Sequence, residues 1–279
     1  MSNRNFLFFI PVIIATTLCG YHCGVRPEAP FTAYRNIAFG KDTPQQSMDV
    51  FLPVKQDSDY TPVFILVHGG AWYFGDKEGM NTLGFDTFFT AKGYAVITMN
   101  YRLVASAKYP APVDDIGLVM DYIKGKRTEW KINPDRICIL GLSSGAQLAM
   151  IYAYRRNTGH RIKAVMDLYG PTDLLDSTAA YGRLRVDVNS LLGPMESNRQ
   201  AWHDASPLFY TRDAVPTAIF QSTADSIVHF KQSEMLEDSL RANGVPVTLY
   251  VWKERGHGLY PKEWKECRES ATAWVKKYL

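Results

Sequence analysis

The segment Gly141-Leu142-Ser143-Ser144-Gly145 carries residue types suited to nucleophilic catalysis. An apolar run at 137–140 precedes it, and a helix-forming run at 146–154 follows it. A sharp turn from strand to helix strains its central residue and crowds the backbone, and glycines two positions before and after relieve that crowding. Only Ser143 has glycine at both positions. The pattern predicts a nucleophile elbow with Ser143 as nucleophile and the backbone N–H of Ser144 at the helix start. The alternative is an ordinary polar turn.

A second glycine-rich segment, His68-Gly69-Gly70-Ala71-Trp72, follows the apolar run 63–67. Small residues after a buried strand allow backbone N–H groups to face a cleft, where they stabilise negative charge on an oxygen. We expect the N–H groups of Gly70, Ala71 and Ser144 to form an oxyanion hole. Taken alone, the segment would fit a common strand-to-helix turn.

A serine nucleophile needs a base and an acid that orients it. Of the six histidines, His257 lies in a glycine-flanked loop after the last apolar run. Asp225 follows the apolar run 217–221. The carboxyl ends of parallel strands meet at one sheet edge, so both side chains can reach Ser143. We predict a Ser143, Asp225 and His257 triad, with Asp173 as the alternative acid.

The rest of the chain alternates strand and helix patterns, which predicts an α/β protein with a mostly parallel eight-stranded sheet and helices on both faces. Strands are expected at 35–40, 47–53, 63–67, 95–99, 137–140, 164–168, 217–221 and 247–252. Helices are expected at 80–92, 113–129, 145–156, 230–243 and 262–278.

The interval 171–215, after the sixth expected strand, contains no clear strand pattern. Long excursions of this kind in compact domains are usually functional, so we expect a small cap or lid; a packing excursion is the alternative. Trp72, Tyr181 and Trp202 are candidate stacking faces for a sugar or an aromatic acid, although aromatic residues more often belong to the core.

Length and composition fit one domain, expected at 30–279, with two small domains as the alternative. The net charge is +3, and no basic run or stripe is present, which excludes a typical nucleic-acid footprint. Nothing implies a partner protein, and the sequence does not indicate an oligomeric state. Cys138 lies in a strand pattern and Cys267 in a helix pattern, so we expect two isolated thiols rather than a disulfide framework.

The N-terminus differs from the remainder. Residues 6–18 form an uncharged apolar run behind Arg4, too short for a comfortable membrane span of about 20 residues. We expect a signal peptide at 1–23 and an exported protein; a buried segment of the mature fold is the alternative. Lipid attachment at Cys19 or Cys23 is a further alternative, but Leu18 and His22 stand where small residues are expected.

With these residues identified, residues 34–279 resemble the α/β-hydrolases and, more narrowly, the bacterial carboxylesterases called BD-FAE, or feruloyl and acetylxylan esterase-like. The resemblance rests on QQSMDVFLP, HGGAWYFGDK, NYRL, PAPVDDI, INPDRICILGLSSGAQLA, YGPTDL, ASPL, DSIV and RGHG. It implies the same triad and oxyanion hole, and a reaction without metal or organic cofactor. Two departures are Ala146, where relatives often have glycine, and the missing glycine in the segment 221–225.

The resemblance implies a serine esterase acting on acetyl or feruloyl esters of plant polysaccharide or on related small esters. An arylformamidase-like amidase or a peptidase on the same frame is the first alternative, because the HGGAW segment does not separate these enzymes. The second alternative is a binding module that keeps the fold without catalysis.

Overall fold

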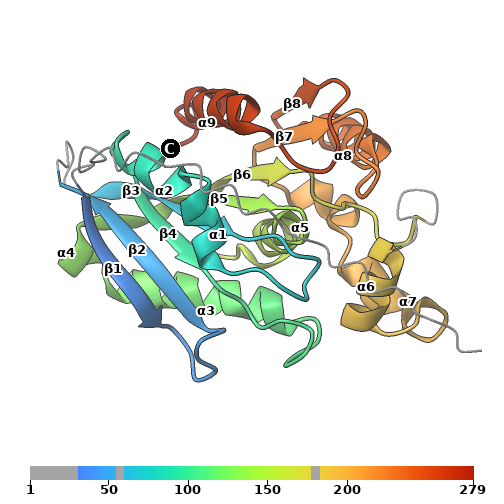
Figure 1. Ribbon diagram of the computed structural model, residues 1–279, viewed down its shortest axis with the longest axis horizontal. Coiled ribbons are helices and arrows are strands. Elements are labelled where there is room, and N and C mark those ends of the chain that lie inside the picture. Colours follow the sequence, from blue (N-terminus) through green and yellow to red (C-terminus); the bar gives the residue numbers. More distant parts are fainter. Residues whose placement is uncertain (1–30, 55–59, 177–182) are drawn as a thin grey trace, which may run out of the picture.

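The computed structural model of the chain describes residues 31–54, 60–176 and 183–279. The expected signal peptide at 1–23 and Tyr181 lie outside these residues. Eight strands form one sheet in the order β1-β2-β4-β3-β5-β6-β7-β8 (Figure 1). β1 pairs antiparallel with β2, β2 pairs antiparallel with β4, and the remaining strands are parallel. The predicted eight-stranded, mostly parallel α/β fold is therefore confirmed.

The strands are β1 Phe31–Ala38, β2 Ser47–Pro53, β3 Thr61–Val67, β4 Ala95–Met99, β5 Ile132–Leu142, β6 Ile162–Leu168, β7 Thr217–Ser222 and β8 Val247–Trp252. The α-helices are α1 Lys77–Thr82, α2 Phe85–Thr90, α3 Ala111–Gly125, α4 Arg127–Trp130, α5 Ser144–Ile151, α6 Arg183–Leu192, α7 Met195–Asp204, α8 Phe230–Ala242 and α9 Pro261–Val275. A π-helical turn at Tyr152–Arg156 continues α5, and a 3-10 helix spans Pro207–Asp213.

Helices cover both faces of the central parallel strands, so side chains on both faces of these strands are buried. In β3, Val63, Ile65 and Val67 pack with residues of α3, α5 and α8. Phe64 and Leu66 face the other way and pack with residues of α2 and α9. This arrangement explains why the central strands read as continuous apolar runs rather than as alternating patterns.

Local backbone conformation divides three of the expected helices. The expected helix 80–92 is two short helices, because Gly84 between them adopts a left-handed φ of 70° that a regular helix does not allow. The expected helix 145–156 begins as α5 and ends in the π-helical turn. The expected helix 113–129 is α3 followed by α4, because Lys126 between them has a non-helical φ of −101° and ψ of 6°. Apolar periodicity locates all three regions correctly, but it does not indicate such interruptions.

The interval 171–215 forms α6, α7 and the 3-10 helix, with no strand among its described residues. In Figure 1, α6 and α7 lie to the right of the sheet and of α5. The interval is anchored at both ends: the Leu208 N–H donates to the Thr172 carbonyl (3.0 Å), and the Leu174 N–H donates to Ser206 Oγ (2.9 Å). Its action as a cap or lid stays a prediction.

The described residues contain no helix both long and apolar enough to cross a membrane. Cys138 and Cys267 are both buried and free, which confirms the expectation of two isolated thiols.

Candidate active site

Ser143 occupies the turn between β5 and α5 in a strained conformation, with φ 51° and ψ −120°. The flanking glycines are required by close backbone contacts. A β-carbon at Gly145 would lie 2.2 Å from the carbonyl oxygen of His68, and one at Gly141 would lie 2.4 Å from the Cα of Ala146. The turn therefore has the geometry that the glycine spacing predicts, with Ser143 projecting from its apex.

His257 connects Ser143 with Asp225. Its Nδ1 lies 2.7 Å from Asp225 Oδ2, and its Nε2 lies 2.9 Å from Ser143 Oγ. A carboxylate only accepts hydrogen bonds, so Nδ1 carries the proton and the Nε2 lone pair faces the serine hydroxyl. The structure thus brings together the loops after β5, β7 and β8 and places the three predicted triad residues in contact, in the order that a nucleophile, a base and an orienting acid require.

The Asp225 carboxylate is buried and held by its own loop. Its Oδ1 accepts hydrogen bonds from the backbone N–H groups of Ile227 (2.8 Å) and Val228 (2.9 Å), which leaves Oδ2 for His257. The His257 ring contacts the Tyr169 ring in an edge-to-face arrangement, with the ring centroids 4.8 Å apart. These contacts fix the orientation of the imidazole before any substrate binds.

Asp173, the alternative acid, has a different role. Its Oδ1 accepts a hydrogen bond from the Leu175 N–H (2.9 Å), and its own N–H donates to Gln232 Oε1 (2.7 Å). The carboxyl closes a local turn, and burial raises its pKa. The structure therefore brings Asp225, and not Asp173, to the histidine.

The expected oxyanion loop, residues 68–74 and called the oxyanion loop below, lies directly against Ser143: a β-carbon at Gly69 would lie 3.3 Å from Ser143 Cβ. Gly70, Ala71 and Trp72 all have positive φ angles, of 127°, 53° and 62°. The Tyr73 and Phe74 N–H groups both turn back to the Gly70 carbonyl, at 3.0 and 3.1 Å.

This fold-back leaves donors available at the loop. Within the described residues, the N–H groups of Gly70, Ala71 and Ser144 have no hydrogen-bond acceptor. A Gly70 β-carbon would lie 1.9 Å from the Phe74 carbonyl oxygen, so this position requires glycine. Free N–H groups on a strained loop and at a helix start, both next to Ser143, match the donor set predicted for an oxyanion hole.

The profile of the family described as BD-FAE matches residues 48–240, more than half of the chain. The chain belongs to the BD-FAE family. It is 25% identical over 233 residues to a probable carboxylic ester hydrolase, LipM, of Mycobacterium tuberculosis, covering 77% of this chain and 53% of LipM. It is 26% identical to a kynurenine formamidase of Meyerozyma guilliermondii, covering 71% of this chain and 78% of that protein.

The fold matches a solved structure of a truncated carbohydrate esterase from gut microbiota. The TM-score is 0.76 with 22% identity, covering 89% of this chain and 98% of that chain. At this identity the match shows the α/β-hydrolase fold. This BD-FAE chain spans little more than half the length of several curated relatives that it matches.

Two predicted stacking residues of this BD-FAE chain are core residues, and that prediction is wrong. Trp72 and Trp202 are both fully buried. The Trp72 indole N–H donates to Gln147 Oε1 (3.1 Å), and the Trp202 indole N–H donates to the Gly193 carbonyl (3.0 Å). Neither ring has a face that a substrate could reach. The third candidate, Tyr181, lies outside the described residues.

Gln147 joins the oxyanion loop to the end of α7, and sequence reasoning missed it. Besides accepting from Trp72, it donates from Nε2 to the Ala205 carbonyl over 2.7 Å. Its side chain is fully buried. A glutamine in the first turns of an otherwise apolar helix, four residues after the nucleophile, is the one sequence signal that indicated this role.

His68 supports the oxyanion loop from inside. Its ring stacks on Tyr101 with centroids 4.3 Å apart, and its Nδ1 lies 2.7 Å from the Gly69 carbonyl oxygen. Burial lowers the pKa of His68 to about 4, so the ring is neutral near pH 7 and Nδ1 donates to that carbonyl. The Tyr101 hydroxyl also donates to the His68 carbonyl (3.1 Å).

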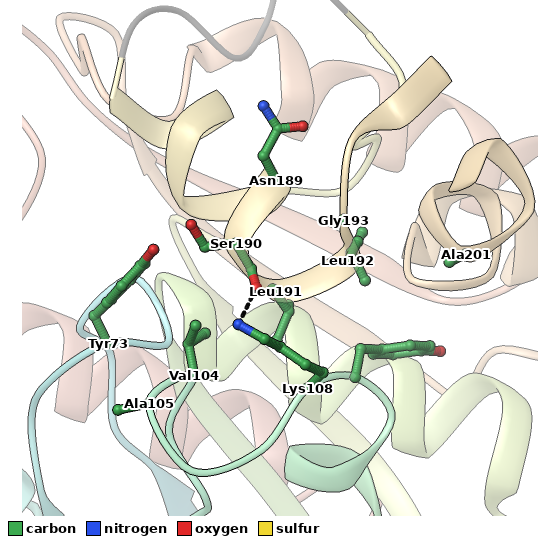
Figure 2. Close-up of a pocket in the computed structure, with 11 residues that line it drawn as sticks. Tyr73, Val104, Ala105, Lys108, Asn189, Ser190, Leu191, Leu192, Gly193 and Ala201 are labelled. Atoms are coloured by element: carbon green, nitrogen blue, oxygen red, sulfur yellow. Dashed lines mark hydrogen bonds between the residues drawn. The ribbon is translucent and has the colours of Figure 1, made fainter. Parts of the chain in front are cut away.

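A cavity of about 720 Å³ includes Tyr73 of the oxyanion loop in its lining (Figure 2). One wall comes from Tyr73 and from the loop after β4, and the other comes from α6 and α7. Sequence analysis did not predict it, because its walls are far apart in the chain. The lining residues are Tyr73, Val104, Ala105, Lys108, Tyr109, Asn189, Ser190, Leu191, Leu192, Gly193 and Ala201.

Proposed function

We propose that this chain is a serine carboxylesterase in which Ser143 attacks an ester carbonyl. The observation that carries the proposal is the continuous contact from Ser143 Oγ through His257 to Asp225, at 2.9 and 2.7 Å. Relatives named as ester hydrolases support the reaction class. The buried carboxylate stabilises the imidazolium that forms when the histidine accepts a proton.

The reaction has two steps. His257 Nε2 takes the Ser143 proton as Oγ bonds to the carbonyl carbon, and the N–H groups of Gly70, Ala71 and Ser144 stabilise the oxyanion. Collapse of the tetrahedral intermediate breaks the bond to the alcohol oxygen, which receives the proton from Nε2. Water, deprotonated by the same nitrogen, then attacks the acyl-enzyme, and Ser143 regains its proton as the acid leaves.

For the substrate, we propose acetyl or feruloyl esters of plant polysaccharide or related small esters. The likeness to a carbohydrate esterase structure supports this class. Export through the N-terminal segment, whether as a secreted, periplasmic or lipid-anchored protein, is part of the same proposal because polysaccharide lies outside the cell. The apolar run at 6–18 is its support.

The amidase alternative is favoured by one observation, the match to a kynurenine formamidase over 71% of this chain. The same triad can cleave a formamide, because the leaving amine accepts the proton from the histidine as an alcohol does. Parallel assays on acetylated xylan, methyl ferulate and N-formylkynurenine separate the two substrate classes. Cleavage of the formamide alone would reject the ester proposal.

The mechanism is tested by replacing each serine of the elbow. Ser143→Ala is expected to lower hydrolysis of p-nitrophenyl acetate by about 10³-fold or more. Ser144→Ala keeps its backbone N–H and loses only a buried hydroxyl 3.4 Å from the Tyr101 hydroxyl, so its loss is expected to be much smaller. A fluorophosphonate should label wild type and Ser144→Ala at Ser143. Near-full activity in Ser143→Ala would reject the mechanism.

A further inference from the structure

Tyr73, which lines the cavity in Figure 2, belongs to the oxyanion loop. Tyr73 is two residues from Ala71 and four from Gly69, which packs against Ser143. Four residues span at most about 14 Å when extended, and the 3.0 Å hydrogen bond from the Tyr73 N–H to the Gly70 carbonyl shortens this path. A substrate that places its carbonyl oxygen in the oxyanion hole can therefore reach the cavity with a neighbouring group of moderate size.

The loop after β4, which forms the same wall of the cavity as Tyr73, is hydrogen-bonded to the oxyanion loop. The Val104 N–H donates to the Trp72 carbonyl over 2.9 Å, so the loop after β4 keeps a fixed position relative to the oxyanion loop. The opposite wall is held against it by two contacts: the Tyr109 N–H donates to the Leu191 carbonyl (3.3 Å), and the Tyr109 hydroxyl donates to the Asp204 carbonyl (2.9 Å). The cavity is thus a preformed space.

Its lining combines an aromatic ring with a cation. The Tyr73 side chain is 37% exposed, and Figure 2 shows it reaching toward α6 from the lower wall. The Lys108 ammonium donates to the Ser190 carbonyl over 2.7 Å (dashed line in Figure 2). Lys108 forms no ion pair with the described residues, and an ammonium group has three donors, so two remain for a ligand.

These groups select one kind of occupant. A long apolar acyl chain would remove the Lys108 ammonium from water without supplying an acceptor, which is unfavourable. The cavity volume of about 720 Å³ lies within the range of sites that hold whole ligands, so an acetyl group would fill only a small part of it. A sugar ring stacks its C–H face on an aromatic ring, and its hydroxyl oxygens accept hydrogen bonds from an ammonium group.

We propose that this cavity is a sugar subsite, in which a sugar residue of the alcohol part of the ester stacks on Tyr73 and accepts a hydrogen bond from Lys108. The proposal rests on the proposed esterase function. It makes the alcohol, rather than the acyl group, the part that this face of the molecule recognises.

The activity test uses Tyr73→Ala, Lys108→Met and a matched control, Tyr260→Ala. Tyr260 is 61% exposed and three residues from His257, but it does not line the cavity. For each protein, kcat/KM is measured on acetylated xylo-oligosaccharide and on p-nitrophenyl acetate. The ratio of the two values should fall about fivefold in both cavity variants and stay near the wild-type value in Tyr260→Ala. Unchanged ratios in the cavity variants, or an equal fall in the control, would overturn the proposal.

A binding test separates this subsite from the chemistry. Calorimetric titration of Ser143→Ala protein with deacetylated xylo-oligosaccharide should show binding that Ser143→Ala combined with Tyr73→Ala loses. Absence of binding in the first protein, or equal binding in both, would overturn the subsite. If the wild type fails to hydrolyse p-nitrophenyl acetate, the esterase function fails, and the titration still decides whether the cavity takes a sugar.

Discussion

Trp72, whose peptide follows the proposed oxyanion donor Ala71, is held by Gln147 from the helix that follows the nucleophile. The indole N–H only donates and the Ala205 carbonyl only accepts, so these two partners determine which end of the Gln147 amide faces each. One buried side chain thereby connects the elbow helix, the oxyanion loop and the end of α7.

Gln147→Met is expected to lower kcat by about tenfold on small esters, because the apolar side chain releases Trp72 and lets the oxyanion loop move. KM should change little, since the substrate contacts are not removed. Gln232→Met is the matched control: Gln232 is also a buried amide, but its partners are Thr172 and Asp173 rather than the oxyanion loop. If both variants lose stability and neither lowers kcat, Gln147 is a core residue only. Steady-state kinetics and thermal melting measure both effects.

Asp225→Asn is expected to keep the conformation of the loop after β7 and to abolish the action of His257 as a base. The amide oxygen would retain the hydrogen bonds from Ile227 and Val228, so its NH₂ group would face His257 Nδ1. Nδ1 would then have to accept, and Nε2 would carry the proton toward Ser143, which is the wrong tautomer. We expect kcat to fall about 10³- to 10⁴-fold. Asp173→Asn, measured alongside it by the same ester assay, should keep most of the activity; the reverse pattern would move the acid role to Asp173.

Gly145→Ala is expected to destabilise the fold strongly. The new β-carbon would lie 2.2 Å from a backbone oxygen of His68, which cannot move without shifting the oxyanion loop. We expect a loss of about 3 kcal/mol or more in the free energy of unfolding. Gly79→Ala on α1 is the control, because nothing lies within 4 Å of a β-carbon there. That substitution should be neutral or stabilising by up to about 1 kcal/mol. Chemical denaturation compares the two; similar stability would contradict the packing at the elbow.

Asp167→Asn is expected to change the pH dependence of stability. Asp167 lies fully buried in β6, and burial raises its pKa to about 7 from an ordinary value of 3.8. Between these values the folded protein keeps a proton that the unfolded chain has released. The stability associated with this group is therefore complete below about pH 4 and is lost as the pH rises through 7.

An asparagine at position 167 cannot titrate, and its oxygen can still accept from the Gly170 N–H, which lies 2.8 Å from Asp167 Oδ1 in the wild type. The melting temperature of Asp167→Asn, minus that of the wild type, should be several degrees higher at pH 8 than at pH 5. Asp121→Asn on the exposed side of α3 serves as the control. A difference that does not change with pH would show that Asp167 does not titrate in this window.

The sequence alone determined the features that depend on local backbone geometry. Glycine spacing distinguished Ser143 from Ser144, because a strained turn crowds only its nearest neighbours. Continuous apolar runs located the central strands, because both faces of a parallel sheet are covered by helices. The order of strands and loops along the chain placed Ser143, Asp225 and His257 at one edge of the sheet.

Only the tertiary structure decided which side chains face solvent and which partners they meet. Trp72 and Trp202 have the residue type of a stacking face, but other elements cover them completely. Asp173 and Asp225 both follow strands, yet only one carboxylate points at the histidine. The cavity joins Tyr73 to α6 across more than a hundred residues of chain. Burial and contact between distant segments depend on how whole elements pack, and periodicity along one segment carries no information about that packing.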